Sequence, residues 1–187
     1  MKIIGFMGIG LALICCSCQT NDSQHHNPPT AQAGKQDPTA NVVATVWLSA
    51  ASGSNVRGLV NFIREKDKIR VYASVSGLTP GKHGFHIHEK GDCSAPDASS
   101  AGGHFNPTGM HHGGPDDMQR HVGDFGNLEA DTSGNAHYSK VFANLPLEGN
   151  SSIIGKAVII HAQADDMKTQ PTGNAGGRVA CGVIERK

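Results

Sequence analysis

The sequence predicts an all-β domain in which eight short antiparallel strands form a sandwich or barrel. From residue 42 onward, apolar and polar side chains alternate over short stretches, which is the pattern of half-buried strands. Turn-forming residues separate these stretches, and none has the spacing of an amphipathic helix. The 24 glycines and the low aromatic content of 5% favour strands and turns over long helices. A chain of this length has room for one hydrophobic core.

The first four strands are expected to follow one another through short turns. They lie at 42–50, 56–65, 69–76 and 82–88. The intervening segments 52–55, 66–68 and 79–81 are rich in residues that favour reverse turns. The last four strands are expected at 126–130, 136–142, 156–161 and 178–184.

Two long loops interrupt this series of strands, at 89–120 and 164–177. The first loop is rich in glycine and histidine. Long loops are unusual in so compact a domain, and on a rigid scaffold they tend to carry function. We therefore expect both loops to be functional.

The first 40 residues differ in composition from the rest of the chain. Met1 and Lys2 precede a mostly apolar run to Ile14, which is short for a membrane span but typical of a signal peptide. The following cysteines resemble a bacterial lipoprotein cleavage box, with Cys18 as the first candidate for lipidation and Cys16 as the second. Ordinary secretion is the alternative. Residues 19–40 lack large apolar side chains, so a flexible linker is expected before a domain at 41–187.

The charge balance restricts the partners. The 16 lysines and arginines equal the 16 aspartates and glutamates, which gives no sign of a nucleic-acid partner or of binding to an anionic membrane surface. Any attraction for a charged substrate has to be local. We expect an exported protein, either anchored to a membrane through its N-terminal lipid alone or free in a periplasmic or extracellular space.

His86 and His88 lie two residues apart in the predicted strand at 82–88. Side chains alternate along a strand, so both imidazoles point to one face while Ile87 points to the core. Two imidazoles on one face can clamp copper or zinc. A His-x-His pair alone is weak support for a metal site.

A denser group of candidate ligands follows in and after the first long loop. His104, His112, His121 and Asp124 match a tetrahedral zinc set of three imidazoles and one carboxylate. A polar surface loop with incidental histidines is the alternative. His161 ends the strand at 156–161, and only its partnership with the other histidines makes it a candidate ligand.

Six blocks of the sequence resemble the copper-zinc superoxide dismutase family and occur in the family's order. They are GFHIHEKGD (84–92), GGHFNP (102–107), HGGP (112–115), RHVGDFGN (120–127), IIGKAVIIHAQADD (153–166) and GNAGGRVACGVI (173–184). The resemblance implies a Greek-key β fold and an enzyme that converts superoxide to dioxygen and hydrogen peroxide. It assigns copper to His86, His88, His104 and His161. It assigns zinc to His104, His112, His121 and Asp124, with His104 bridging the two metals.

The resemblance also gives roles to residues outside the ligand sets. Arg178 matches the arginine that guides the superoxide anion to copper, and Asp165 matches the carboxylate that links a copper-bound to a zinc-bound histidine. Cys93 and Cys181 match the family's disulfide. In the implied reaction copper alternates between two oxidation states, and His104 releases copper on reduction and delivers a proton to the product.

The remaining candidates are given minor roles. His83 matches a structural histidine of the family, whereas His111 and His137 have no counterpart among its ligands and are expected to be solvated. Lys168 is expected to be an ordinary surface charge, with a contribution to anion steering as the alternative.

Two rival functions and the assembly state stay open. A copper-buffering protein on the same fold and a non-catalytic adhesion domain are the rivals, but the complete ligand sets and Arg178 favour the enzyme. The chain ends in the charged residues 185–187, where eukaryotic members continue with apolar residues that help form their dimer. We expect either a monomer or a homodimer of another kind.

Overall fold

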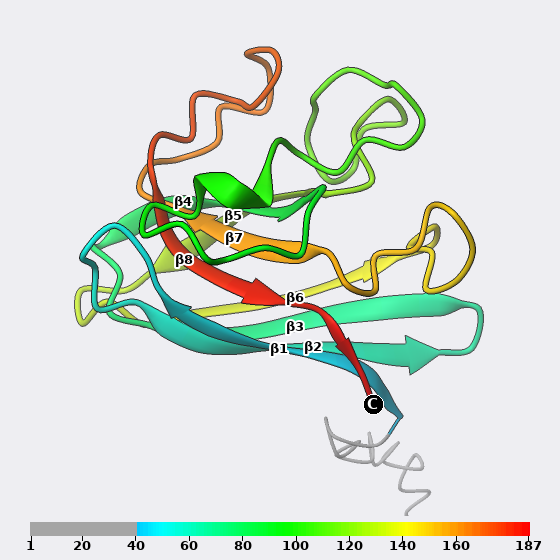
Figure 1. Cartoon of the computed structure of the whole chain (residues 1–187), viewed down its shortest axis with the longest axis horizontal. Helices are drawn as coiled ribbons and strands as arrows, with labels where there is room; N and C mark the ends of the chain where they lie inside the picture. Colours follow the sequence, from blue (N-terminus) through cyan, green and yellow to red (C-terminus); the bar gives the residue numbers. More distant parts are fainter. Residues whose placement is uncertain (1–40) are drawn as a thin grey trace, which may run out of the picture. The chain divides into compact units, whose positions relative to one another are not determined.

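The computed structural model describes residues 41–187, which form an all-β domain (Figure 1). The strands are β1 (Val42–Ala50), β2 (Arg57–Glu65), β3 (Lys68–Ser76), β4 (Gly81–His88), β5 (Asp124–Ala130), β6 (Ala136–Phe142), β7 (Ala157–His161), β8 (Arg178–Val183) and β9 (Glu185–Arg186). A single 3-10 turn, η1 (Ser99–Ala101), lies in the first long loop. Within 41–187, no helix has the length and apolar character needed to cross a membrane. The predicted signal peptide, lipidated cysteine and linker lie outside these residues.

The strands form one antiparallel sheet that closes on itself. Their order is β2-β3-β6-β5-β4-β7-β8-β1-β9, and β1 pairs with β2 as well. The successive strands β3 and β4 are not neighbours in this order, and neither are β6 and β7. Among β1 to β8, two connections therefore cross between non-neighbouring strands, as in a Greek-key barrel. The predicted fold is confirmed, with β9 as an addition to the eight expected strands.

The ninth strand begins just after Ile184, where the last predicted strand is interrupted. Ile184 is almost fully buried, and its backbone N–H donates to the carbonyl of Lys156. β8 therefore ends one residue earlier than predicted, and the chain continues as the short β9. β9 pairs with Ala44 and Thr45 of β1. The charged residues that end the sequence thus belong partly to the sheet.

The core lies inside the barrel and follows the alternation that predicted the strands. On β3, Ile69, Val71, Ala73 and Val75 are buried, and the residues between them are partly exposed. Several phenylalanine rings pack against one another in the core, and Phe85 and Phe125 meet edge to face at 5.2 Å between ring centroids. Burial of such apolar surface stabilises the barrel by about 25 cal/mol for each Å² removed from water.

Strand β4 has a second buried face, which carries the histidines. Phe85 and Ile87 point into the barrel core. His86 and His88 point to the opposite face and are nevertheless 0% and 1% exposed. This burial requires a cover outside the barrel, and the long loops between β4 and β5 and between β7 and β8 lie over this part of the sheet (Figure 1).

Two irregularities in the sheet lie beside histidines of this face. The β4–β5 register shifts between Gly84 and His86, and the β7–β8 register shifts between Ile160 and His161. A bulge inserts an extra residue into one strand and changes the direction of the neighbouring side chains. Here the extra residues lie in the partner strands β5 and β8, so β4 and β7 continue without an insertion through His86 and His161.

Candidate metal centre

Four buried histidines form the first group of potential metal ligands, which we call the copper group. β4 supplies two of them, the first long loop supplies the third, and the end of β7 supplies the fourth: His86, His88, His104 and His161. One ring nitrogen from each residue lies within 4.8 Å of the others. Imidazole nitrogens are ligands that suit copper. The pairing of His104 with His88 in an isolated β-bridge brings the loop histidine to the strand.

A second group lies beside the first and is called the zinc group. It contains three histidines and one carboxylate: His104, His112, His121 and Asp124. The Nδ1 atoms of His104, His112 and His121 lie 2.9, 3.1 and 3.2 Å from Oδ1 of Asp124. Tetrahedral zinc with bonds of about 2.0 Å would place its ligand atoms about 3.3 Å apart. The three distances to the carboxylate are already close to this spacing.

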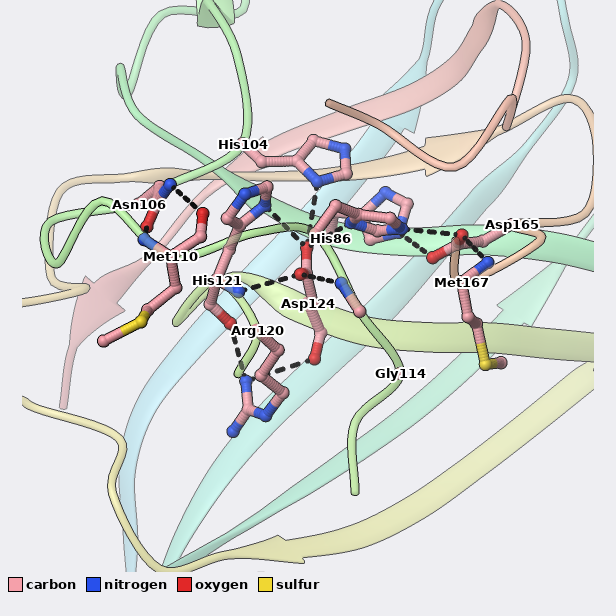
Figure 2. A network of polar contacts seen from close by, with 12 residues as sticks. His86, His104, Asn106, Met110, Gly114, Arg120, His121, Asp124, Asp165 and Met167 are labelled. Carbon is pink, nitrogen blue, oxygen red and sulfur yellow. Dashed lines mark hydrogen bonds and ion pairs between the residues drawn. The ribbon is translucent and has the colours of Figure 1, made fainter. Parts of the chain in front are cut away.

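His104 belongs to both groups. Its Nδ1 contacts Asp124, and its other nitrogen, Nε2, belongs with the copper group, where its ring lies 4.0 Å from that of His86 between centroids. Figure 2 shows the His104 ring above the Asp124 carboxylate, to which a dashed line joins it. The two nitrogens of this single ring are therefore directed at two neighbouring sites.

Three ring nitrogens in this centre are buried and have no hydrogen-bond partner. They are Nδ1 of His86, Nε2 of His104 and Nδ1 of His112. The last of these is close to Asp124, but it is not directed along a hydrogen bond. Buried polar atoms are almost always satisfied in native proteins, and a group of exceptions calls for an explanation such as an ion. Copper bonded to the first two nitrogens and zinc bonded to the third would satisfy all three, so the residues fit the metals.

Backbone carbonyls fix the other two copper-group rings. Nδ1 of His88 lies 2.9 Å from the carbonyl oxygen of Gly102, and Nδ1 of His161 lies 3.1 Å from that of Gly176. A carbonyl only accepts, so each Nδ1 carries the proton and each Nε2 keeps its lone pair. The two Nε2 atoms face each other at 3.3 Å. Both are thus presented as ligand atoms.

The carboxylate of Asp165 links a histidine of the copper group to a histidine of the zinc group. Its Oδ2 lies 2.8 Å from Nε2 of His86, and its Oδ1 lies 2.9 Å from Nε2 of His112. The backbone of Asp165 is held by the side chain of Asn127, which both donates to its carbonyl and accepts from its N–H. Carboxylates in this position orient ligand rings and make them more basic.

The ionisation of the copper-group histidines suits metal binding. Burial lowers the pKa of His104 to about 4 and that of His161 to about 3. Burial likewise lowers the pKa of His86 and of His88. Neutral imidazoles bind metals, so the copper group is ready for its ion at neutral pH. The Asp124 carboxyl is buried too, but its contacts with three imidazoles outweigh that burial and hold its pKa far below the usual range.

Arg178, at the start of β8, has a guanidinium that is fixed by the first long loop. Nη1 donates to the carbonyl of Ala98 and Nη2 to that of Gly102, both at 2.6 Å. The same Gly102 carbonyl accepts from His88, so the arginine and a copper-group ligand share one support. The guanidinium is half-buried and keeps further N–H groups free to bind an anion.

A disulfide fastens this loop to the barrel. Cys93 and Cys181 are bonded, which joins the loop to β8 three residues beyond Arg178. Beneath the loop lies a small apolar cluster that is separate from the main core: Ala51, Ala98, Ala101, Ala157, Ile159 and Cys181. Disulfides persist in oxidising compartments, so this bond is typical of an exported protein.

The other sequence candidates lie outside the two ligand groups. His83 is buried, and its ring contacts the carbonyls of His161 and Thr79, which is a structural arrangement. His111 and His137 are exposed. The ammonium of Lys168 has no hydrogen bond or ion pair among the described residues.

Several supporting residues were missed at the level of sequence. Gly173 has a positive φ of 68°, and a Cβ atom there would collide with Oδ1 of Asp165. One guanidinium nitrogen of Arg120 donates to the carbonyls of His121, Val122 and Asp124. Gly173 and Arg120 lie inside the sequence blocks that carry the family resemblance, which is the signal that could have identified them.

Comparison with known proteins gives consistent matches. The family model for copper/zinc superoxide dismutase (SODC) matches residues 56–184. The chain is 43% identical over 157 residues to the superoxide dismutase [Cu-Zn] of Paramecium bursaria Chlorella virus 1, covering 80% of this chain and 83% of the viral protein. It is 47% identical over 133 residues to the extracellular superoxide dismutase [Cu-Zn] of Caenorhabditis elegans, covering 68% of this chain and 60% of the nematode protein.

The chain belongs to the copper/zinc superoxide dismutase family. It is accordingly an oxidoreductase whose cofactors are copper and zinc. Among solved structures, the crystal structure of the clock protein EA4 is similar to this chain, with a TM-score of 0.70 and 42% sequence identity. The match covers 79% of this chain and 96% of EA4.

Proposed function

We propose that this chain converts superoxide to dioxygen and hydrogen peroxide at copper held by the copper group, beside zinc held by the zinc group. The observation that carries the proposal is the set of three buried, unpartnered nitrogens on His86, His104 and His112. Two of them belong to one ligand group and the third to the other, and His104 is common to both. This is the pattern of a centre built for two adjacent ions.

The metals divide the chemistry between them. Copper supplies one-electron transfer by alternating between its two oxidation states, whereas zinc supplies a fixed charge without redox change. The remaining steps depend on the protein's own side chains.

Arg178 binds the anion in this scheme. Its guanidinium is held by two carbonyls, so the positive charge cannot turn away from the copper group. A fixed cation beside a cleft raises the local concentration of a small anion and orients it. The link through the Gly102 carbonyl keeps this charge in a constant position relative to His88.

His104 holds the proton for the second half of the reaction. Its Nδ1 stays with Asp124, while Nε2 is the buried atom that lacks another partner. With the metals bound, Nε2 would take up a proton from solvent and pass it to the departing product, and the second proton of hydrogen peroxide would come from solvent. Asp124 keeps the ring in place throughout, because its carboxylate also contacts His121 and the backbone N–H of Gly113.

The proposed location is outside the cytoplasm, with a lipid on Cys18 or, as second choice, Cys16. The disulfide and the similarity to an extracellular dismutase of C. elegans support export. Mass spectrometry of the mature N-terminus is the test of the anchor. A diacylglycerol on either cysteine is the expected result, and cleavage without a lipid would contradict anchoring.

A superoxide-consumption assay tests the enzymatic proposal. Protein loaded with copper and zinc is expected to consume superoxide catalytically, and His88→Ala or His161→Ala is expected to abolish this activity by removing a copper ligand. His111→Ala is the matched control, because His111 is exposed and lies outside both groups. Wild-type activity in His88→Ala or His161→Ala would overturn the proposal.

A further inference from the structure

The loop between β7 and β8 contacts the zinc-group ligand His112 from two directions. Asp165 contacts the ring, as described above. Gln170 contacts the backbone of the same residue. Its Oε1 accepts the His112 N–H at 2.8 Å, and its Nε2 donates to the His112 carbonyl at 2.9 Å. One amide side chain therefore pairs with both backbone polar groups of a single ligand residue.

Gln170 is itself held in a closed turn. Its Nε2 also donates to the carbonyl of Lys168 at 3.2 Å. Around it, Oδ1 of Asp166 accepts the N–H groups of Lys168 and Thr169, and the N–H of Gly173 donates to the carbonyl of Thr169. The amide is thus presented to His112 from a turn that is stabilised independently of the metal ligands.

The backbone at His112 needs such support from outside. His112 follows the exposed His111, and carboxylates hold the N–H groups of Gly113 and Gly114 on its other side. Within residues 41–187, the N–H and carbonyl of His112 itself have no hydrogen-bond partner other than Gln170. Nδ1 of His112 is one of the three unpartnered nitrogens, and it lies 3.1 Å from the Asp124 oxygen. A small shift of the His112 backbone would move this nitrogen away from the other three candidate zinc ligands, His104, His121 and Asp124.

We propose that Gln170 is a positioning residue for the zinc site. It fixes the backbone of His112 while Asp165 fixes the ring, and it thereby couples the loop that precedes Arg178 to the zinc-ligand loop. The inference rests on the proposed assignment of zinc to His112. It predicts that the hydrogen bonds of Gln170, rather than its bulk, determine how firmly zinc is held.

Two variants and a control test this role in the full-length protein. Gln170→Ala removes both bulk and hydrogen bonds, whereas Gln170→Met keeps a side chain of similar size without them. Thr172→Ala, in the same loop, is the control, because the Thr172 side chain takes no part in these contacts. Zinc affinity is measured by competition with a chromophoric chelator, alongside copper affinity and the melting temperature of the metal-free protein.

Both Gln170 variants are expected to bind zinc about 10-fold to 100-fold more weakly, which is the range for loss of a group that supports a ligand. Copper affinity and the metal-free melting temperature are expected to stay at wild-type values, and Thr172→Ala should resemble wild type throughout. In the zinc-loaded variants, the His112 amide should exchange its hydrogen faster.

Three results would overturn the inference. One is wild-type zinc affinity in Gln170→Ala, and another is wild-type zinc affinity in Gln170→Met. The third is a parallel fall in zinc affinity, copper affinity and metal-free melting temperature, which would make Gln170 a general stabiliser of the fold. A wild-type protein that takes up no zinc is a separate outcome, because it would overturn the proposed function and this inference with it.

Discussion

At the scale of single residues, the metal centre depends on backbone groups that each hold more than one side chain. The Gly102 carbonyl accepts hydrogen bonds from both His88 and Arg178. A Cβ atom at this position would collide with the side chain of Glu89, and φ is 76°, so glycine is required. A movement of this one carbonyl would displace a copper-group histidine and the guanidinium that we propose binds the anion.

Arg178→Ala is expected to lower the rate of superoxide consumption by at least about tenfold, because the fixed positive charge is lost. The rate should also depend less on ionic strength, since salt screens the attraction that the variant lacks. Arg178→Lys should be intermediate, because an ammonium cannot reproduce the two-pronged contact with Ala98 and Gly102. Metal content is measured as the control. An unchanged rate with an unchanged salt dependence would exclude a guiding role for Arg178.

The two groups are expected to respond differently to pH. Burial opposes the charging of His112, but its contacts with Asp124 and Asp165 outweigh this and raise its pKa to about 9. In the metal-free protein His112 is therefore protonated at pH 7. Since its folded pKa lies above the unfolded value of about 6.5, its contribution to stability is complete below pH 6.5 and is lost as the pH rises through 9.

Zinc binding at pH 7 should consequently release about one proton from His112. Copper binding should release none from His104 or His161, whose pKa values of about 4 and 3 leave them neutral. Calorimetric titrations in buffers of different ionisation enthalpy count these protons. Equal proton release by both metals would show that the two groups do not differ in this way.

At the scale of structural elements, the loops are held to the barrel by a few contacts. Cys93 and Cys181 are separated by 88 residues. In the chain-entropy model, closing a loop of this length stabilises the folded state by about 5 kcal/mol. Replacement of both cysteines by serine is expected to remove several kcal/mol of the free energy of unfolding, as measured by urea denaturation. A loss below about 1 kcal/mol would show that the apolar cluster beneath the loop holds it without the bond.

The second long loop offers a matched pair of glycines. A Cβ atom at Gly173 would collide with the carboxylate of Asp165, whereas a Cβ atom at Gly177 would meet nothing within 4 Å. Gly173→Ala is expected to displace Asp165 and to weaken metal binding by about tenfold or more. Gly177→Ala should bind both metals as the wild type does. Equal behaviour of the two variants in metal titrations would contradict the role given to Gly173.

The sequence predicted the strands better than the contacts that support the ligands. Alternation correctly placed the strands that carry His86, His88 and His161, because side-chain direction in a strand depends on a local rule. The shared carbonyl of Gly102 and the amide clamp of Gln170 could not be predicted in this way. Both depend on contacts between segments that are distant in the sequence, and no periodic pattern in the sequence predicts such contacts.

At the scale of the whole molecule, the order of the strands brings the two ligand groups together. β4 lies between β5 and β7, so ligands from three strands and one loop converge although His86 and His161 are 75 positions apart in sequence. The fold class was predictable from composition and alternation. The pairing order was implied by the family resemblance, because non-local strand order leaves no local pattern in a sequence.

The most direct test of the account is anomalous diffraction at the copper and zinc absorption edges from crystals of the metal-loaded protein. We expect one copper and one zinc on opposite sides of the His104 ring, with Nε2 toward copper and Nδ1 toward zinc. We also expect Asp165 to lie outside both coordination shells. A single metal, or a His104 ring that faces only one ion, would contradict the shared two-metal centre.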